Sequence, residues 1–416
     1  MSRKILMMRG LFRKMKSAFM FLFLFGALAL NSVAQTGVAG GSGSAFNPCH
    51  CSSTLAFARA AKLKRGINAS EWFAQVYDKR GYTAEHFQAW TTAEDIALIK
   101  SMGFDHVRLS VNPQPPPGST SNNLFDPREP NRIPAEYLGS LDAAVKMILD
   151  HGLAVVIDMH PEGDLKARLA KDDDYVERFA DFWRALAAHY SSWDADRVFL
   201  EVMNEPEFYD PYRWMGVQTK LAAAIREGAP ELTIIAAGAR WSDDDDLIFQ
   251  EPLHDANIIY NFHFYEPHVF THQGATWSAY YFHWLRGLRY PSNVESTERA
   301  AALVPDEVDR LHVIRYGYDR WDAARIEAEV KQAGEWARRR GVPLVCNEFG
   351  VFRDYSDPAD RAAWLHDART AFEKNGIGWT MWDYSGSFGV VVKKDGKAVP
   401  DDGVLRALGM KALGMK

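Results

Sequence analysis

Eight short β-rich runs alternate with long amphipathic stretches from residue 65 onward, and this alternation restricts the chain to few folds. The runs are residues 65–70, 106–111, 154–159, 198–203, 233–238, 258–265, 343–350 and 377–384. Apolar residues recur at helical spacing in six intervening stretches, residues 91–102, 134–150, 174–190, 211–227, 322–340 and 358–375. Glycines stand just past five of these stretches, at Gly103, Gly152, Gly228, Gly341 and Gly376. Strands separated by helices predict a parallel sheet.

Eight such units over about 320 residues are typical of an α/β (β/α)8 barrel, the TIM barrel. The near-continuous apolar runs at 154–157 and 377–381 favour strands that are buried on both faces. An open, doubly wound sheet is the alternative, but no G-x-G-x-x-G follows the first strand, so the usual dinucleotide signature is missing. The fifth helix is poorly marked, and residues 266–321 form a long, aromatic-rich insertion after strand six.

The N-terminal region predicts export. Residues 1–16 are basic, residues 18–30 are apolar, and small residues at Ser32 and Ala34 precede Gln35, which together indicate a secretory signal peptide at 1–34. An uncleaved membrane anchor is the alternative, although an apolar run of 13 residues is shorter than the roughly 20 that span a bilayer. We therefore expect a secreted protein, periplasmic or extracellular, with no stable membrane association after cleavage. A Gly/Ser-rich lead-in at 35–59, a single domain at 60–405 and a tail at 406–416 complete the predicted organisation.

Charge and cysteine content exclude several classes of protein. Removing the six positive charges of the leader from the net charge of −6 leaves −12 on the remainder. A body this acidic would repel phosphate backbones, so we expect no nucleic-acid partner and favour a neutral substrate. Cys49, Cys51 and Cys346 make neither a disulfide framework nor a zinc site with suitable spacing.

Polar residues close several of the predicted strands, at the end of a barrel where active sites lie. Two of them, Glu205 and Glu348, end strands on opposite sides of the barrel. Glycoside hydrolysis needs such a pair, one carboxylic acid to protonate the leaving oxygen and one carboxylate to attack the anomeric carbon or to activate water. Arg108 beside Glu348 would favour its ionised form, and Asn204 is placed to bind a sugar 2-hydroxyl.

Seven strand motifs resemble those of glycoside hydrolase family 5, in the family's order, from about residue 60 to about residue 390. They are RGINAS at 65–70, HVRLSV at 106–111, VVIDMH at 155–160, VFLEVMNEP at 198–206, HFYEP at 263–267, PLVCNEFG at 343–350 and GWTMWDY at 378–384. The resemblance implies that Glu205 is the acid/base and Glu348 the nucleophile. It also implies retention of anomeric configuration, with carboxyl groups about 5–5.5 Å apart, and no cofactor.

The same resemblance implies substrate contacts at further positions, which are Arg108, His160, Asn204, His263, Tyr265 and Trp382, the last as the floor of the −1 subsite. The FTHQGATW segment at 270–277 resembles a stretch of cellulase-like members and adds Trp277. Pro161 departs from the pattern, because many members have a second histidine after the one that matches His160. Other aromatic residues that are candidates for sugar subsites are Trp72, Tyr77, Trp241 and Trp284, with Trp241 favoured among them.

No metal site is expected. His263, His268, His272 and His283 invite one, but their spacing shows no set of three or four converging ligands with a second shell. The acidic run Asp243–Asp246 lacks the interleaved ligands of a calcium loop and is read as a solvated surface.

The expected protein is a secreted retaining β-glycosidase of cellulase type, cutting internal β-1,4 linkages of a β-glucan polysaccharide or oligosaccharide. The alternatives are the same chemistry on mannan or another β-glycan, since a fold does not determine a substrate, and a non-catalytic glycan-binding protein, which would be expected to lack one of the two carboxylates. An adhesion module is disfavoured by the absence of architectural repeats and of an anchoring tail. Oligomeric state is not predicted.

Overall fold

The computed structural model describes residues 55–115, 123–394 and 397–412. The chain divides into two units, Met1–Cys49 and His50–Lys416, and every described residue belongs to the second. The predicted signal peptide and most of the predicted lead-in lie outside the described residues. Among the described residues, no helix combines the length and apolar character needed to cross a bilayer.

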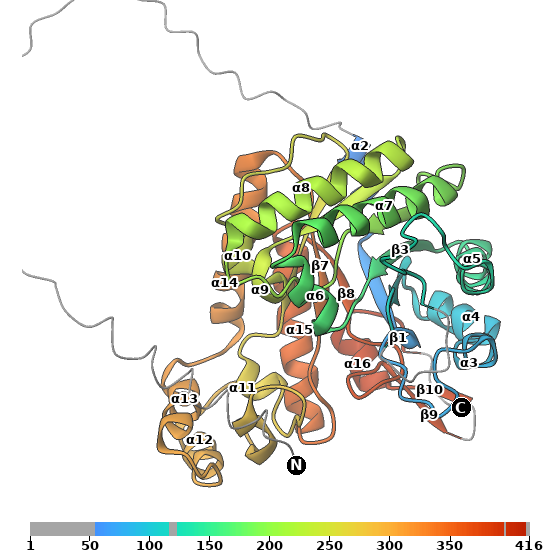
Figure 1. The fold of residues 1–416 in the computed structure, drawn as a ribbon. Coiled ribbons are helices and arrows are strands. Elements are labelled where there is room, and N and C mark those ends of the chain that lie inside the picture. The colour runs from blue at the N-terminus through green and yellow to red at the C-terminus, as the bar shows by residue number, and fades with distance from the viewer. Residues whose placement is uncertain (1–54, 116–122, 395–396, 413–416) are drawn as a thin grey trace, which may run out of the picture. The chain divides into compact units, whose positions relative to one another are not determined.

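Eight parallel strands close into a barrel in chain order, and β1 pairs with β8 to complete the circle (Figure 1). They are β1 (Arg65–Phe73), β2 (His106–Val111), β3 (Ala154–Met159), β4 (Val198–Glu201), β5 (Thr233–Ala237), β6 (Ile258–Phe264), β7 (Leu344–Phe349) and β8 (Gly378–Met381). The predicted (β/α)8 barrel is thereby confirmed, and the open sheet is wrong. Strands β4 and β8 end before their predicted limits of residues 203 and 384, because the chain turns there out of the regular ladder. Isolated backbone bonds to the neighbouring strands persist, from Val202 N–H to Ile235 C=O and Asn204 N–H to Met159 C=O, and from Trp382 N–H to Phe349 C=O and Tyr384 N–H to Asn68 C=O.

Helices follow most strands and surround the barrel. They are α3 (Ala84–Trp90), α4 (Ala93–Met102), α5 (Ala135–Asp150), α6 (Gly163–Leu169), α7 (Asp173–Tyr190), α8 (Pro211–Gly228), α14 (Ala323–Arg340) and α15 (Pro358–Lys374). All six predicted helices are present. Gly103 and Gly341 end their helices with φ of 103° and 66°, a left-handed conformation that glycine adopts without steric cost. Gly228 differs from its prediction, because it is the last residue of α8 and Ala229 forms the cap.

Two regions left open by the sequence contain further helices. After β5 come α9 (Ala239–Ser242) and α10 (Asp244–Leu247) in place of one long fifth helix. The insertion after β6 contains α11 (His268–Thr271), the 3-10 helix η1 (Tyr280–Trp284), α12 (Val294–Ala301) and α13 (Glu307–Tyr318). In Figure 1 the α12–α13 pair lies to one side of the barrel, below the strands.

Both predicted domain boundaries fall inside packed structure. The lead-in was expected to reach residue 59, but α2 (Leu55–Ala60) is helical and its Arg59 side chain is buried, where Nη1 donates to Thr233 Oγ1. The tail was expected to begin at residue 406, which lies within α16 (Asp402–Ala407), and Leu408 and Met410 are buried in the core. The hairpin of β9 (Val391–Lys394) and β10 (Lys397–Pro400) precedes α16. The packed domain therefore includes residues 55–59 and 406–410.

Inside the barrel the side chains change from apolar to polar along the strands. The inward positions near the strand starts form an apolar cluster of Leu63, Ala154, Val156, Phe199, Ile235, Ile259 and Val345. Two residues further along β3 and β4, the same inward faces carry Asp158 and Glu201, since side chains alternate with a period of two. The apolar layer thus supports a polar layer at the carboxyl ends of the strands.

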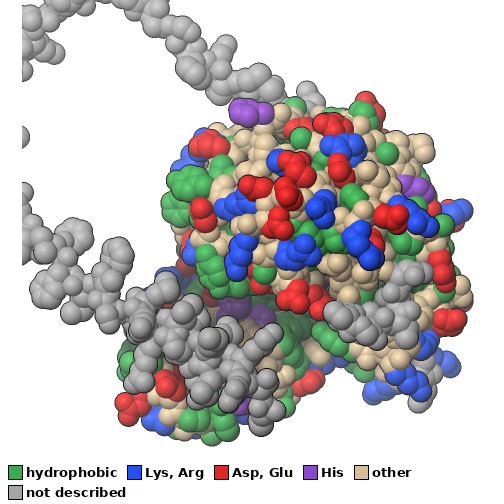
Figure 2. Space-filling model, viewed as in Figure 1, with side chains coloured by type: hydrophobic (Ala, Val, Ile, Leu, Met, Phe, Trp, Pro, Cys, Tyr) green, Lys and Arg blue, Asp and Glu red, His purple; other side chains and the backbone are tan. Residues whose placement is uncertain are grey.

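The outer surface over α7 and α8 has charges of both signs. Figure 2 shows acidic and basic side chains interspersed on the face that these helices cover. Several are paired between the two helices, with Arg213 2.6 Å from Asp173 and Arg184 2.6 Å from Glu227. Exposed pairs of this kind contribute little stability each.

Candidate active site

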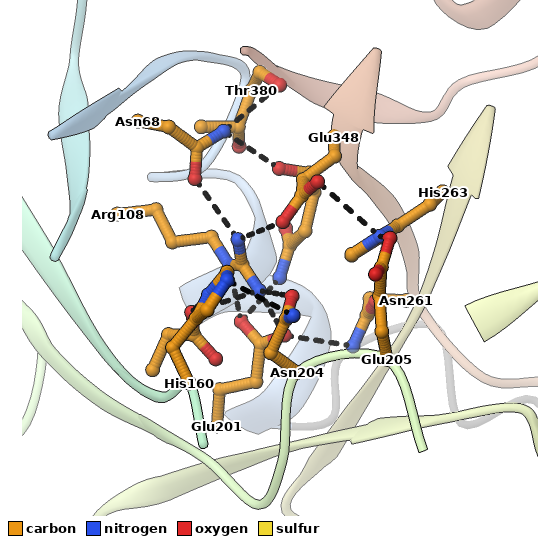
Figure 3. Close-up of polar contacts among 12 residues, drawn as sticks. Asn68, Arg108, His160, Glu201, Asn204, Glu205, Asn261, His263, Glu348 and Thr380 are labelled. Atoms are coloured by element: carbon orange, nitrogen blue, oxygen red, sulfur yellow. Dashed lines mark hydrogen bonds and ion pairs between the residues drawn. The ribbon is translucent and has the colours of Figure 1, made fainter. Parts of the chain in front are cut away.

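The two predicted glutamates lie close together at the carboxyl ends of β4 and β7, with His263 between them (Figure 3). His263 Nδ1 lies 3.0 Å from Glu205 Oε1 and 3.5 Å from Glu348 Oε2. One ligand-type atom from each of the three residues lies within 4.8 Å of the others. Strands β4 and β7 are separated by more than 140 residues in the sequence. Closure of the barrel brings their carboxyl ends to the same face, where the Glu205 and Glu348 carboxyl groups lie close together.

The environments of the two carboxyl groups differ. The Glu348 side chain is 5% exposed, whereas that of Glu205 is 27% exposed. Glu205 also has a backbone φ of 43°, a conformation that is costly for a residue with a side chain and that concentrates at functional sites. Glu205 therefore stands at the edge of the site and Glu348 in its wall.

Both oxygens of Glu348 accept hydrogen bonds. Arg108 Nη1 donates to Oε1 at 2.7 Å, and the Tyr265 hydroxyl donates to Oε2 at 3.0 Å. Burial, and then the neighbouring Glu348 carboxylate, raise the pKa of Tyr265 well above its usual value, so its hydroxyl keeps the proton that it donates. These two donors hold the carboxylate plane in one orientation.

Arg108 is completely buried among three carboxylates. Its Nε and Nη2 form a fork on Glu201 at 2.8 and 2.9 Å, and Nη2 also lies 3.0 Å from Asp158 Oδ2. Burial favours a neutral guanidinium, but the three carboxylates outweigh it and hold the pKa of Arg108 well above its ordinary value. Burial raises the pKa of Asp158 to about 6 and also raises that of Glu201, against the attraction of the arginine.

A chain of hydrogen bonds sets the orientation of the Asn204 amide. Burial lowers the pKa of His160 to about 3, so the ring is neutral and carries one proton. Its Nδ1 donates to Asp158 Oδ2 at 2.8 Å, which leaves Nε2 to accept from Asn204 Nδ2 at 3.2 Å. Asn204 Oδ1 in turn accepts from Arg108 at 3.0 Å. The asparagine is therefore held beside the carboxylate pair in one of its two amide orientations.

Aromatic side chains border the site. Trp382 stacks on His160, with ring centroids 5.8 Å apart and an interplanar angle of 18°. Trp277 of the insertion is 58% exposed and packs edge-on against Phe352, which clusters with Tyr265. Trp241 is 45% exposed, and its backbone N–H donates to the carbonyl of Pro206, next to Glu205.

The remaining aromatic candidates separate by exposure. Trp72 is buried and its indole N–H donates to the Phe87 carbonyl, so its interpretation as a sugar contact is wrong and it is a core residue. Strand β1 continues to Phe73, beyond its predicted end at residue 70, and this extension places the Trp72 side chain in the core. Tyr77 and Trp284 are exposed.

Several of the other residues considered for metal binding have protein partners. His268 and His272 stack on each other at 5.1 Å, and His268 Nδ1 lies 2.9 Å from Glu266 Oε1. Asp243 caps α10, and Asp246 accepts two bonds from Arg240. Within the described ranges, the group of ligand-type side chains that converges is Glu205, His263 and Glu348, the carboxylate pair itself.

Several residues of the site were given no role in the sequence analysis: Asn68, Asp158, Glu201, Asn261 and Asn347, of which Asp158 and Asn347 were noted only as polar residues at strand ends. All are buried, and each bonds within the polar layer that surrounds Arg108. The period-two alternation of the strands could have identified Asp158 and Glu201, because each lies two residues beyond an inward apolar position.

The buried histidine makes a testable contribution to stability. An unfolded histidine takes up a proton below about pH 6.5, whereas native His160, with its pKa of about 3, stays neutral. The folded-state pKa is depressed, so this stabilisation is present above pH 6.5 and is lost as the pH falls toward 3. Urea unfolding at pH 7.5 and 4.5 should show that the wild type loses about 2–3 kcal/mol more than His160→Gln over this interval. Parallel pH dependences of the two proteins would contradict the assignment of a neutral, buried ring.

The chain is similar to known proteins along most of its length. Residues 69–387 match the family model described as Cellulase (glycosyl hydrolase family 5). Endoglucanase C of Acetivibrio thermocellus is 28% identical over 346 residues, covering 82% of this chain and 96% of the relative. Cellodextrinase A of Ruminococcus flavefaciens is 27% identical over 322 residues, covering 75% and 83%. The structure of Thermotoga maritima Cel5A in complex with cellobiose superposes with a TM-score of 0.69 at 24% identity, covering 85% of this chain and 99% of that one, and thus shares the fold.

Proposed function

Since this chain belongs to glycosyl hydrolase family 5 and is a glycoside hydrolase, we propose that it cleaves internal β-1,4 bonds of glucan by double displacement. Glu348 is the nucleophile and Glu205 the acid/base. The observation that carries the proposal is the convergence of these carboxyl groups on His263, with one oxygen of each within 4.8 Å of the other. Retaining enzymes have carboxyl groups about 5–5.5 Å apart, whereas inverting enzymes separate them by roughly 6.5–9.5 Å to admit water.

In the first step, a Glu348 oxygen attacks the anomeric carbon while the bond to the leaving oxygen breaks. Glu205 delivers its proton to that oxygen, so the departing sugar leaves as an alcohol. Arg108 and Tyr265 hold the attacking carboxylate in place, so little orientational freedom remains to be lost when the transition state forms. Asn204, oriented by His160 and Arg108, binds the 2-hydroxyl, and Trp382 forms the floor of the −1 subsite.

In the second step, Glu205 deprotonates a water molecule, which attacks the anomeric carbon of the glycosyl-enzyme intermediate. The ester bond to Glu348 breaks and the carboxylate is restored. His263 Nδ1 donates to Glu205 Oε1 and lies 3.5 Å from Glu348 Oε2, and the ring stays neutral, because burial lowers its pKa to about 4. A neutral imidazole orients both carboxyl groups without adding a full charge.

A glucan substrate is supported by the relatives named as endoglucanases. The exposed rings of Trp277 and Trp241 offer flat apolar faces for sugar rings. Mannan remains the alternative with the same chemistry. The purified protein should be assayed for reducing-end release on carboxymethyl cellulose, barley β-glucan, xyloglucan, xylan and galactomannan. Release from the first two would support the proposal, and release from galactomannan alone would keep the mechanism and replace the substrate.

Export of the protein is proposed on the sequence of residues 1–34. N-terminal sequencing of the protein recovered from periplasm and culture medium should give a chain that begins at Gln35. A product that keeps its N-terminal residues in the membrane fraction would replace this proposal with the uncleaved anchor.

Replacing Glu205 by glutamine should separate the two steps. We expect a loss of about 10²–10⁴-fold in kcat/KM on cellotetraose, because the sugar leaving group needs the proton. Hydrolysis of 2,4-dinitrophenyl β-cellobioside should show a much smaller loss in kcat/KM, because this leaving group departs without protonation. Steady-state assays of both substrates measure the contrast, and equal losses on both would assign the proton to another residue.

A further inference from the structure

Glu201 has no part in the two proposed chemical steps, yet it is the carboxylate that Arg108 binds with two of its nitrogens. It is completely buried, and it receives both Nε and Nη2 of the guanidinium. Asn347 donates to its Oε2 at 2.7 Å and Asn261 to its Oε1 at 3.4 Å. Figure 3 shows the guanidinium between Glu201 on one side and Glu348 on the other.

The nitrogens of the Arg108 guanidinium are distributed between these two carboxylates. A fork of two bonds to one carboxylate fixes the plane of a guanidinium. The two N–H bonds of the remaining nitrogen, Nη1, lie in that fixed plane, and they donate to Glu348 Oε1 at 2.7 Å and to Asn68 Oδ1 at 3.0 Å. The position of the attacking carboxylate thus depends on a residue that lies below it in the barrel.

Charge is divided in the same way, because one cation faces three carboxylates. The charged or titratable groups around Arg108 and Glu348, taken strand by strand, are Asp158 and His160 at β3, Glu201 and Glu205 at β4, His263 and Tyr265 at β6 and Glu348 itself at β7. The two histidines are neutral, since burial lowers their pKa values to about 3 and about 4. Glu201 and Asp158 are therefore the groups that compete with Glu348 for the arginine.

We propose that Glu201 is a positioning residue for this reaction, which orients the Arg108 guanidinium and takes up part of its charge, so that Glu348 stays both aligned and nucleophilic. The inference rests on the proposed function of Glu348. A carboxylate that shares a cation with two others is stabilised less than one that holds it alone, and a less stabilised carboxylate is the stronger nucleophile.

The test is Glu201→Gln, which keeps the shape of the side chain and removes its charge. With more of the arginine's charge on Glu348, kcat on cellotetraose should fall about 10- to 100-fold with little change in KM. The acidic limb of the kcat/KM–pH profile should move about one unit to lower pH. Asp158→Asn removes charge from another edge of the same guanidinium and should move the limb in the same direction, which keeps the test available if the first variant does not fold.

Asp360→Asn is the matched control. Asp360 is also buried and accepts two bonds from an arginine, Arg289, at 2.5 and 3.0 Å, but in contact with the insertion instead of the site. It should lower stability and leave the pH profile unchanged. An acidic limb that stays in place in folded Glu201→Gln and Asp158→Asn would reduce Glu201 to a structural counter-ion and overturn the proposal.

A readout that needs no substrate separates this inference from the proposed function. A ¹³C NMR titration of the Glu348 carboxyl group, identified by its loss in Glu348→Gln, should show a lower titration midpoint in Glu201→Gln than in the wild type. If the wild type cleaves no β-glycan, the proposed function fails, while this titration still shows whether Glu201 acts on the Glu348 carboxylate through Arg108. An unchanged midpoint would refute the coupling even in an active enzyme.

Discussion

Replacing Glu348 by glutamine is expected to lower kcat on β-1,4-glucan by about 10⁴- to 10⁶-fold, the scale of losing the attacking group of an enzyme that works by covalent catalysis. Glutamine is nearly the same shape, so it keeps a carbonyl oxygen where Arg108 Nη1 donates to Oε1. It cannot form the glycosyl ester. The fold should therefore survive while the first chemical step fails, and steady-state kinetics with circular dichroism on the same sample would measure both.

Chemical rescue sharpens this prediction. In Glu348→Gly the missing carboxylate leaves space on the face from which it attacks, and azide should enter there and give an α-glycosyl azide from an activated β-cellobioside. In Glu205→Gly, azide should attack the intermediate from the opposite face and give the β-azide. The stereochemistry of the product, measured by NMR, distinguishes the two glycine variants. A Glu348→Gln enzyme that retained more than about 1% of the wild-type kcat would exclude Glu348 as the nucleophile.

Replacing Arg108 by methionine should cause the largest loss of stability, about 3–5 kcal/mol in the free energy of unfolding. The side chain is completely buried, and its removal leaves Asp158, Glu201 and Glu348 without the cation that they share. Lysine should restore only part of the loss, since an ammonium cannot form the fork on Glu201. Urea unfolding at pH 7 measures the effect for both variants.

The control for this prediction is an arginine on the surface. Arg184 pairs with Glu227 and Asp181 with its side chain 41% exposed, and its replacement by methionine should change the free energy of unfolding by at most about 0.5 kcal/mol. An Arg108→Met protein as stable as Arg184→Met would show that the three carboxylates bind protons or rearrange instead of remaining as unpaired charges.

Stability would also depend on pH through the carboxyl groups of this layer. Native Asp158, with a pKa raised to about 6, binds a proton more readily than an unfolded aspartate, which favours the folded state below pH 6 and opposes the effect of His160. The contribution of His160 is therefore the difference between the pH dependences of the wild type and His160→Gln.

The strands and helices of the barrel were predictable because their signals are local. Apolar spacing marked all eight strands and six of the helices, and left-handed glycines such as Gly103 ended helices where expected. The glutamates that end β4 and β7 could be identified before their positions were known, since barrel topology brings every strand end to the same face. The helices after β5 and in the insertion were missed. Four of them, α9, α10, α11 and η1, have only four or five residues, which is too short for a helical period to be recognised, whereas α12 and α13 have 8 and 12 residues.

The amino-acid sequence by itself thus determined the barrel, the family resemblance and the two carboxylates, since each depends on neighbouring residues or on one strand end. Only the tertiary structure decided that Trp72 is a core residue, and that Arg108 is shared among Asp158, Glu201 and Glu348. Arg108 is separated by 93 residues from Glu201 and by 240 from Glu348. Contacts over such distances arise when the barrel closes and the inward side chains meet, and no periodicity along the chain encodes which of them will bond.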